Sequence, residues 1–496
     1  MVTVLSKFPC LRQDFLASIV VFLVAVPLCV GVAVASGVPA ELGLVTGIVG
    51  GLLTGLMPGS SLQVSGPAAG LTVIVFEAVS EFGVGTLGVI VLIAGLLQLA
   101  MGFLKIGRWF RAISVSVVEG MLCGIGLVII AGQIYAAAGL KAPETGIGKI
   151  AGLPGAFADT LGSTEALASL ALGAGTIAVI VLWKKMPKAV QSVPGALAAV
   201  LLATVATAAF SLPVATVQVE GLLGVIQLPG ADAFGELAGP AIWGTIVAFA
   251  LIASAESLFS AAAVDRLHDG PRTEYNKEMI AQGAGNTVCG LLGALPMTAV
   301  IVRSSANVAA GAKTKASRVL HGVWLLLFAA AMPWALALIP IPALAGILVH
   351  AGWKLIPFRQ IASLWRSHRG EALILVVTAV AIVAVNMFEG VLIGLALAVA
   401  KTAWEASHLK LEVIDKGAGP IQVYLSGNAT FLRLPKILSS LEALPQGRPA
   451  ELDLSGLHHI DHACRTALDN WAERHGAIGT EPVEVTAAEK KVTADT

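Results

Sequence analysis

The sequence predicts an all-α polytopic membrane protein that carries a small α/β domain at its C-terminal end. Its 496 residues are 56% hydrophobic and only 12% charged, whereas an ordinary soluble domain has about 25% charged residues. Apolar runs of membrane-spanning length recur from residue 15 to residue 407. Beyond His408 the chain turns polar and alternates strand-like with helix-like segments. These three observations determine the predicted fold class.

Counting the apolar runs gives fourteen predicted spans. They lie near residues 15–35, 42–57, 67–79, 84–104, 112–134, 164–183, 194–212, 240–263, 277–294, 297–311, 318–338, 341–356, 371–386 and 388–407. With this count, the lysines and arginines that follow the even-numbered spans all fall on one face. The positive-inside rule then places both termini in the cytoplasm, so residues 1–14 form a cytoplasmic N-terminus. The expected location is the plasma or inner membrane.

The third and tenth spans are the short ones, and their positions differ by seven. Each is therefore the third span of a seven-span half. Because seven is odd, the two halves must lie in opposite orientations across the membrane. This predicts two inverted seven-span repeats, a plan typical of secondary transporters.

The third span contains a break, at VSGPAAGLTV (residues 64–73). Irregular backbone survives at membrane depth only where it lines a protein-enclosed cavity. Pro67 suits the first turn of a helix, so we expect a helix that begins there to direct free N–H groups and its positive dipole end at a ligand. The candidate anion-binding residues here are Ser65, Gly66, Pro67, Ala68 and Ala69.

The tenth span contains the matching break, between Leu295 and Val308. Its half-helix should begin near Arg303 and run the opposite way, so that the two helix starts meet and form an anion site. Val302, Arg303 and Ser304 are the candidate residues on this side. The alternative role for Arg303 is that of a counter-ion for a carboxylate such as Glu256.

Glu256 lies in the middle of the eighth span, where an ionisable side chain costs at least about 2.5 kcal/mol and is functional by default. Ser260 is four residues on and shares its helix face. The two could supply oxygen ligands to a cation, or Glu256 could take a proton. The alternative is a structural carboxylate that is hydrogen-bonded to a neighbouring helix.

The C-terminal region predicts a small cytoplasmic domain over residues 409–487, followed by a disordered tail over 488–496. Strand-like and helix-like segments alternate here in the order β-α-β-α-β, at residues 421–425, 434–444, 451–454, 462–475 and 483–486. Its histidines match no zinc spacing, and the chain carries no P-loop or GxSxG motif. We expect neither an enzyme, nor a cofactor, nor a nucleic-acid partner.

Four segments resemble the SulP family of anion transporters, the sulfate-permease group to which prestin also belongs. They are VSGPAAGLTV at 64–73, SAESLFSAAAVDR at 254–266, the run from Gln282 to Gly322, and the opening DFLASIVVFLVAVPLCVGVAVASGVP at 14–39. The resemblance covers the whole membrane region. It implies the uracil-permease-like fold, a homodimer and an elevator movement. The core spans would lie within 15–104 and 240–338, and the gate spans within 112–212 and 341–407 of a transport domain that covers 15–408.

The resemblance also implies roles for single residues. The anion would lie between the helix starts at Pro67–Ala69 and Val302–Ser304. Glu256 and Ser260 match positions at which sodium-coupled bicarbonate transporters of the family carry Asp and Thr as cation ligands. Proton-coupled members use a Glu in the same span, so the coupling ion stays open between H⁺ and Na⁺.

Two features depart from the family pattern. Ala68 stands where bicarbonate transporters can carry a Thr hydroxyl. The C-terminal region looks like a truncated STAS domain, with Glu451–Gly456 as its central strand and His462 in place of a phosphorylatable serine.

The expected function is secondary active transport of a small anion, with bicarbonate as the preferred substrate and H⁺ or Na⁺ as the coupling ion. The alternatives are a sulfate or C4-dicarboxylate symporter, or an uncoupled exchanger, channel or anion sensor. Glu256 argues against a passive pathway, because such a pathway does not need a carboxylate at the coupling position.

Overall fold

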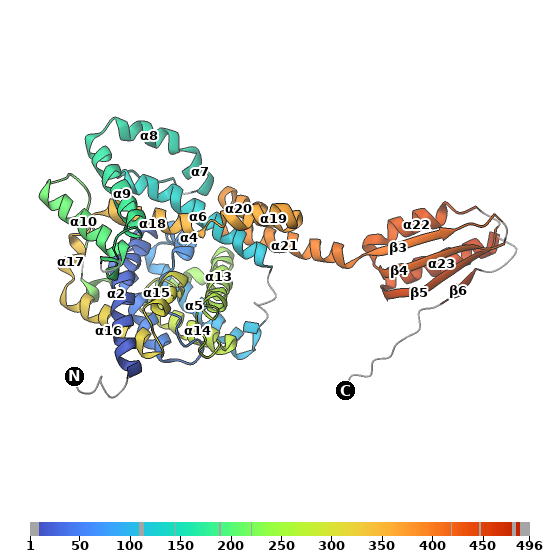
Figure 1. The fold of residues 1–496 in the computed structure, drawn as a ribbon, viewed down its shortest axis with the longest axis horizontal. Helices are drawn as coiled ribbons and strands as arrows, with labels where there is room; N and C mark the ends of the chain where they lie inside the picture. The colour runs from blue at the N-terminus through green and yellow to red at the C-terminus, as the bar shows by residue number, and fades with distance from the viewer. Residues whose placement is uncertain are drawn as a thin grey trace. The chain divides into compact units, whose positions relative to one another are not determined.

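The structure is a computed structural model that describes residues 9–108, 114–143, 145–187, 190–219, 221–417, 419–445, 448–478 and 483–486. The chain divides into two compact units, Met1–Leu395 and Ala396–Thr496 (Figure 1). The predicted tail over 488–496 and the first eight residues of the predicted N-terminus lie outside the described residues.

A helix lies in each of the fourteen apolar stretches. These helices are α2 (Pro9–Ala35), α3 (Ala40–Val49) with its π-helical continuation η1 (Gly50–Thr54), α4 (Thr72–Phe82), α5 (Val84–Phe103), α6 (Val115–Ala137), α9 (Thr164–Trp183), α10 (Gly195–Ala209), α13 (Pro240–Val264), α14 (Tyr275–Leu291), α15 (Ile301–Ala309), α16 (Ala316–Ala331), α18 (Ile341–Leu355), α20 (Arg369–Ala384) and α21 (Met387–Ala406). Among the described residues, seven helices are long and apolar enough to cross a membrane by length and composition. That all fourteen cross it stays a prediction.

Several connections hold short helices that the sequence pattern did not reveal. They are α7 (Gly146–Ala151), α8 (Leu153–Leu161), α11 (Leu222–Val225), α12 (Ala231–Gly235) and α19 (Phe358–Ser367). The predicted eleventh span is interrupted as well, because α16 ends at Ala331 and a separate α17 (Trp334–Ala337) follows Pro333. Proline lacks the N–H that a continuing helix would need.

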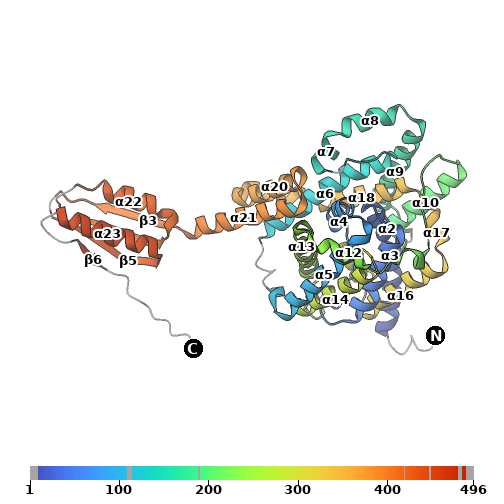
Figure 2. The same ribbon diagram turned by 180° about the vertical axis from the view of Figure 1, so that it is seen from behind.

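Helices from distant parts of the chain pack together in two groups. In the first group α5 lies against α13 and α14, and α2 lies against α15 and α16 (Figure 2). In the second group α6 lies against α18 and α20, while α9 lies against α10 and α18. Each group therefore joins helices from the first and second halves of the first unit.

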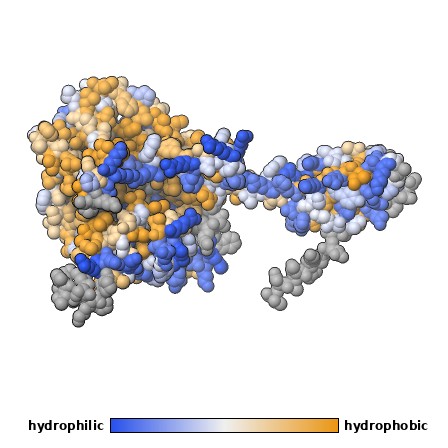
Figure 3. Space-filling view, in the orientation of Figure 1, coloured by the Kyte–Doolittle hydropathy of each residue, from blue (hydrophilic) through white to orange (hydrophobic). Residues whose placement is uncertain are grey.

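The outer surface of the first unit carries many large apolar side chains. Leu201, Val205 and Val380 are each more than half exposed. The face visible in Figure 3 is hydrophobic over wide areas of this unit and mostly hydrophilic over the second unit. Such a surface is suited to contact with lipid tails.

The second unit contains a four-stranded sheet in the order β3-β4-β5-β6. Its strands are β3 (Leu409–Ile414), β4 (Ile421–Ala429), β5 (Ala450–Ile460) and β6 (Glu484–Thr486), and its helices are α22 (Leu434–Glu442) and α23 (His462–Ile478). β4, β5 and β6 are parallel neighbours, whereas β3 is antiparallel to β4. The predicted alternation of strands and helices is confirmed. β3 was not predicted; it is an edge strand, and none of its residues is fully buried.

Candidate functional site

The two predicted breaks meet in the structure. Ser65–Gly66 forms a short strand, β1, that pairs antiparallel with β2 (Thr298–Ala299), so that Ser65 lies opposite Ala299 and Gly66 opposite Thr298. The backbone N–H of Val300 also donates to the carbonyl of Val64 at 2.9 Å. The convergence inferred from two short spans is therefore present, as a two-stranded contact between distant segments.

The helix after the first break starts later than the sequence predicted, and the helix after the second break starts earlier. Pro67 does not begin a helix: Ala68 is extended, a 3-10 turn η2 covers Ala69–Leu71, and α4 begins at Thr72. On the other side α15 begins at Ile301, two residues before Arg303. Strand pairing holds the residues before each helix in an extended conformation, and this tertiary contact fixes where the helices start.

Hydrogen bonds from side chains hold the two breaks in place. The Ser304 hydroxyl accepts from Val64 N–H at 2.9 Å, and the Ser65 hydroxyl accepts from Gln282 Nε2 at 2.7 Å. Asn307 Nδ2 donates to the carbonyl of Leu62 at 2.9 Å. Ser65 and Ser304 therefore serve as part of the scaffold. Val302 is 40% exposed, and its side chain does not take part in this buried region.

Arg303 lies at the meeting point and is fully buried. Its guanidinium passes over Gly66 so closely that a Cβ on that residue would overlap Arg303 Nη1. Nη2 donates to the carbonyl of Pro67 at 3.2 Å, whereas Nε and Nη1 have no hydrogen-bond partner among the described residues. A buried cation with unused donors is costly unless a ligand completes its shell.

Arg318 provides a contrast within the same unit. It is also buried, although the sequence placed it at a cytoplasmic edge and left Arg303 as the sole cation inside the membrane. Its Nε donates to Gly55 O at 3.0 Å, Nη1 to Gln63 O at 3.2 Å and Nη2 to Met57 O at 3.0 Å. Arg318 is therefore a structural clamp on the segment before β1, with a donor on each of its nitrogens in use.

Glu256, on α13, lies beside both breaks. Its carboxylate faces Gly70, where an added Cβ would come within 2.5 Å of Oε1, and it interacts with the side chain of Thr298. Ser257, the next residue, accepts from the N–H of Ala299 at 3.2 Å and so ties α13 to β2. Ser260 is buried one turn further along the same helix.

A buried amide network that the sequence analysis missed supports the second break. Asn286 Nδ2 donates to Gln98 Oε1 at 2.7 Å, and Gln98 Nε2 donates to the Ser254 hydroxyl at 3.0 Å. Asn286 Oδ1 accepts from Met297 N–H at 2.7 Å. Polar residues in the middle of three apolar helices were the available signal, because such groups are normally paired when buried.

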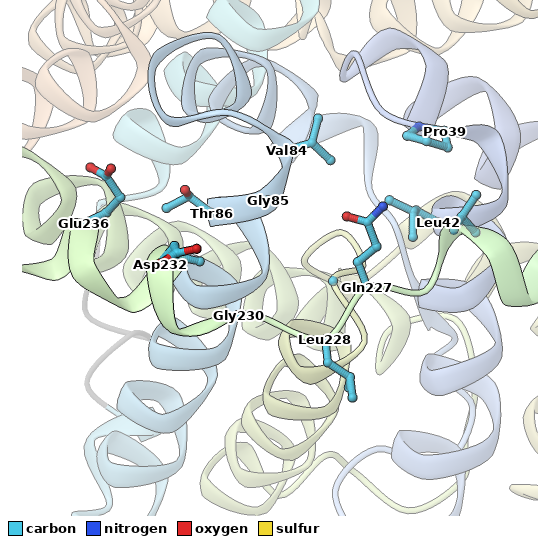
Figure 4. Close-up of a pocket in the computed structure, with 13 residues that line it drawn as sticks. Pro39, Leu42, Val84, Gly85, Thr86, Gln227, Leu228, Gly230, Asp232 and Glu236 are labelled. Atoms are coloured by element: carbon cyan, nitrogen blue, oxygen red, sulfur yellow. The ribbon is translucent and has the colours of Figure 1, made fainter.

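A cavity of about 380 Å³ lies away from this meeting point, between the start of α5 and the segment around α11 and α12. Figure 4 shows Thr86, Asp232 and Glu236 toward one side of it and Gln227 toward Leu42 on the other. None of the candidate anion-binding residues lines this cavity. Within the described part of the chain, no cluster of three or more His, Cys, Asp or Glu side chains could hold a metal ion.

Comparisons with known proteins show the family to which the chain is related. The family model described as the sulfate permease family matches residues 11–378. A Bacillus subtilis (strain 168) protein named "Putative sulfate transporter YvdB" is 29% identical over 486 residues, which cover 95% of this chain and 90% of the relative. The bicarbonate transporter BicA of Picosynechococcus sp. (strain ATCC 27264 / PCC 7002 / PR-6) is 25% identical over 504 residues, covering 93% of this chain and 86% of that protein.

The fold also matches that of solved structures. The overall structure of SLC26A9 aligns with a TM-score of 0.77 at 17% identity, covering 96% of this chain and 84% of that one. The family consists of transporters and not of enzymes. The chain therefore belongs to the sulfate permease family and is a membrane anion transporter.

Proposed function

We propose that the chain is a secondary active transporter that binds its anion where the two broken spans meet. The observation that carries the proposal is the pairing of β1 with β2, which brings together the segments that lead into α4 and α15, with Arg303 beside Gly66 and Pro67. Two helix N-terminal ends that face one point favour a negative charge there.

Arg303 supplies the fixed positive charge of the proposed site. Its Nε and Nη1 groups are unused by the described residues, so they remain available to an anion beside the backbone N–H groups that follow Ala68. A guanidinium offers two parallel donors and suits a planar or tetrahedral oxyanion. The buried methyl of Ala68 adds no donor, and recognition falls to the backbone and to Arg303.

Glu256 is the proposed coupling residue. Its carboxylate touches Gly70 after the first break and Thr298 in the second, so its charge acts on the site where the anion binds. Binding of H⁺ or Na⁺ at Glu256 would remove the repulsion between its carboxylate and an anion. Ser260, on the same face of α13, would provide a further oxygen ligand if the ion is Na⁺.

The movement we propose is an elevator, in which the group containing α2, α5, α13 and α14 slides against the group containing α6, α9, α18 and α20. The support is the packing of helices into these two groups. We also propose that all fourteen helices cross the membrane with both termini in the cytoplasm, that the protein is a homodimer in the plasma or inner membrane, and that the second unit is a truncated STAS domain.

Bicarbonate is the proposed substrate, and sulfate is the second candidate. The likeness to BicA supports bicarbonate. The unused donors of Arg303 and the likeness to a protein named as a sulfate transporter support sulfate, because a doubly charged anion needs more donors.

Uptake into liposomes tests this proposal. The reconstituted protein is given labelled bicarbonate, sulfate or fumarate with an imposed pH gradient, an imposed Na⁺ gradient or neither. We expect bicarbonate to accumulate above equilibrium under one gradient. Uptake that is indifferent to both gradients would contradict coupled transport. Accumulation of sulfate alone would show that sulfate, and not bicarbonate, is the substrate.

A further inference from the structure

A second, smaller cavity lies between the first turns of α4 and the helices α6 and α7. Its volume is about 130 Å³, against about 30 Å³ for one water in the liquid. It is lined by Thr72, Phe76, Gln133 and Lys149 together with apolar residues from the end of α2 and from α6. None of the candidate residues at the meeting of the two breaks lines it, so it is a separate space.

Lys149 is buried in the wall of this cavity, with only 7% of its surface exposed. Its position is fixed on both sides: Tyr135 donates from its hydroxyl to the Lys149 carbonyl at 2.9 Å, and the aliphatic stem lies 3.6 Å from where a Cβ on Gly132 would be. The ammonium group lies 4.7 Å from the centre of the Phe76 ring. A cation held this way offsets only part of the cost of leaving water.

The protein provides incomplete compensation for this charge. Glu77 is close enough for its charge to act on Lys149, yet the two form no ion pair within 4.0 Å among the described residues. Thr72, which also lines the cavity, is only 5% exposed, and its hydroxyl has no hydrogen-bond partner in the described part of the chain. Cavities that stay empty are apolar, whereas one with unpaired polar groups is filled.

We infer that this cavity is a second binding site for a small inorganic oxyanion, held by the Lys149 ammonium group and the Thr72 hydroxyl. An ammonium group supplies charge and up to three donors, and a hydroxyl supplies one more. The volume admits one such anion with accompanying water. Thr72 directly follows the 3-10 turn Ala69–Leu71, so the site adjoins the first break along the chain.

This inference rests on the anion transport established by family membership and not on the proposed roles of Arg303 or Glu256. The first test measures KM and kcat for sulfate and bicarbonate uptake by Lys149→Met, which keeps an apolar stem over Phe76 and Gly132. We expect KM to rise about tenfold with little change in kcat, since a charge-assisted contact is lost. Lys149→Arg should keep a KM close to that of the wild type.

Lys141→Met is the matched control, because Lys141 is exposed in the same connection and does not line the cavity. It removes the same charge from the protein and should leave KM unchanged. A KM that is unchanged in Lys149→Met, or that rises equally in Lys149→Arg or Lys141→Met, would overturn the second site.

A binding measurement separates the two sites. In the Arg303→Met background the proposed central site is weakened, and sulfate or bicarbonate at millimolar concentration should still raise the Tm of the detergent-solubilised protein. Adding Lys149→Met should abolish that remaining shift. If the single and double variants show the same shift, Lys149 does not hold an anion, whatever the outcome for Arg303.

Discussion

Replacing Arg303 by Met should weaken anion binding without destabilising the anion-free protein. The unbranched Met stem can still pack over Gly66, while the guanidinium with its two unpartnered nitrogens is removed. One hydrogen bond to a charged group contributes about 1.5–3 kcal/mol, which corresponds to a rise in Kd of about 10- to 150-fold. The lost bond to Pro67 O is offset by removing a buried charge that is incompletely paired.

The assay is isothermal titration calorimetry with bicarbonate and with sulfate, together with the Tm of the anion-free protein. Arg318→Met is the control, since Arg318 donates to three backbone carbonyls. Removing Arg318 leaves these carbonyls without their donor, which costs about 1–3 kcal/mol of stability for each buried group, so this variant should lose Tm and keep the Kd of its folded fraction. An unchanged Kd in Arg303→Met, or a loss of Tm like that of Arg318→Met, would refute a ligand-binding role for Arg303.

Two further predictions concern other parts of the chain. Gly70→Ala should reduce uptake about 10- to 100-fold, since the new Cβ displaces the Glu256 carboxylate. The control is Gly175→Ala, which should transport normally because there is open space around Gly175. A fully active Gly70→Ala variant would contradict the placement of Glu256. Asp461→Ala should cost the second unit about 0.5–2 kcal/mol in urea unfolding, because Asp461 caps α23 by accepting from Cys464 N–H at 2.8 Å. Loss of hydration raises the pKa of Asp461. The hydrogen bonds that its carboxylate accepts, first among them the one from Cys464 N–H, together have a larger effect, so the pKa lies below its usual value. The stabilisation by the Asp461 cap is therefore present above the pKa that Asp461 has in the unfolded chain, and it is lost as the pH falls through its pKa in the folded domain. A stability difference between wild type and variant that persists below both pKa values would contradict the cap.

The meeting of the two broken spans could be predicted because its signals are local. Pro67 and the glycines beside it interrupt an apolar run, and such interruptions are tolerated in a membrane only where protein surrounds them. Each short span is the third span of a seven-span half, and the inverted orientation of the halves then predicted that the two breaks face each other. The C-terminal alternation of strands and helices was equally legible from periodicity.

The remaining features depend on tertiary contacts. The late start of α4 at Thr72 follows from the pairing of β1 with β2, which no local pattern encodes. Arg318 resembled a solvated residue at the end of a loop until the carbonyls of Gly55, Met57 and Gln63 were found around it. Gly70 likewise matters because it lies close to the side chain of Glu256, which is 186 positions away in the sequence (256 − 70).

The central claim is that Glu256 couples a cation to an anion that binds beside it, and Glu256→Gln tests it most directly. The amide keeps the size and most contacts of the side chain but can neither take a proton at neutral pH nor supply a negative charge to Na⁺. Labelled bicarbonate is followed in proteoliposomes in two modes: accumulation driven by an imposed pH or Na⁺ gradient, and exchange against internal bicarbonate with no gradient. We expect the variant to lose accumulation while it retains exchange. Accumulation at the wild-type level would contradict a coupling role for Glu256.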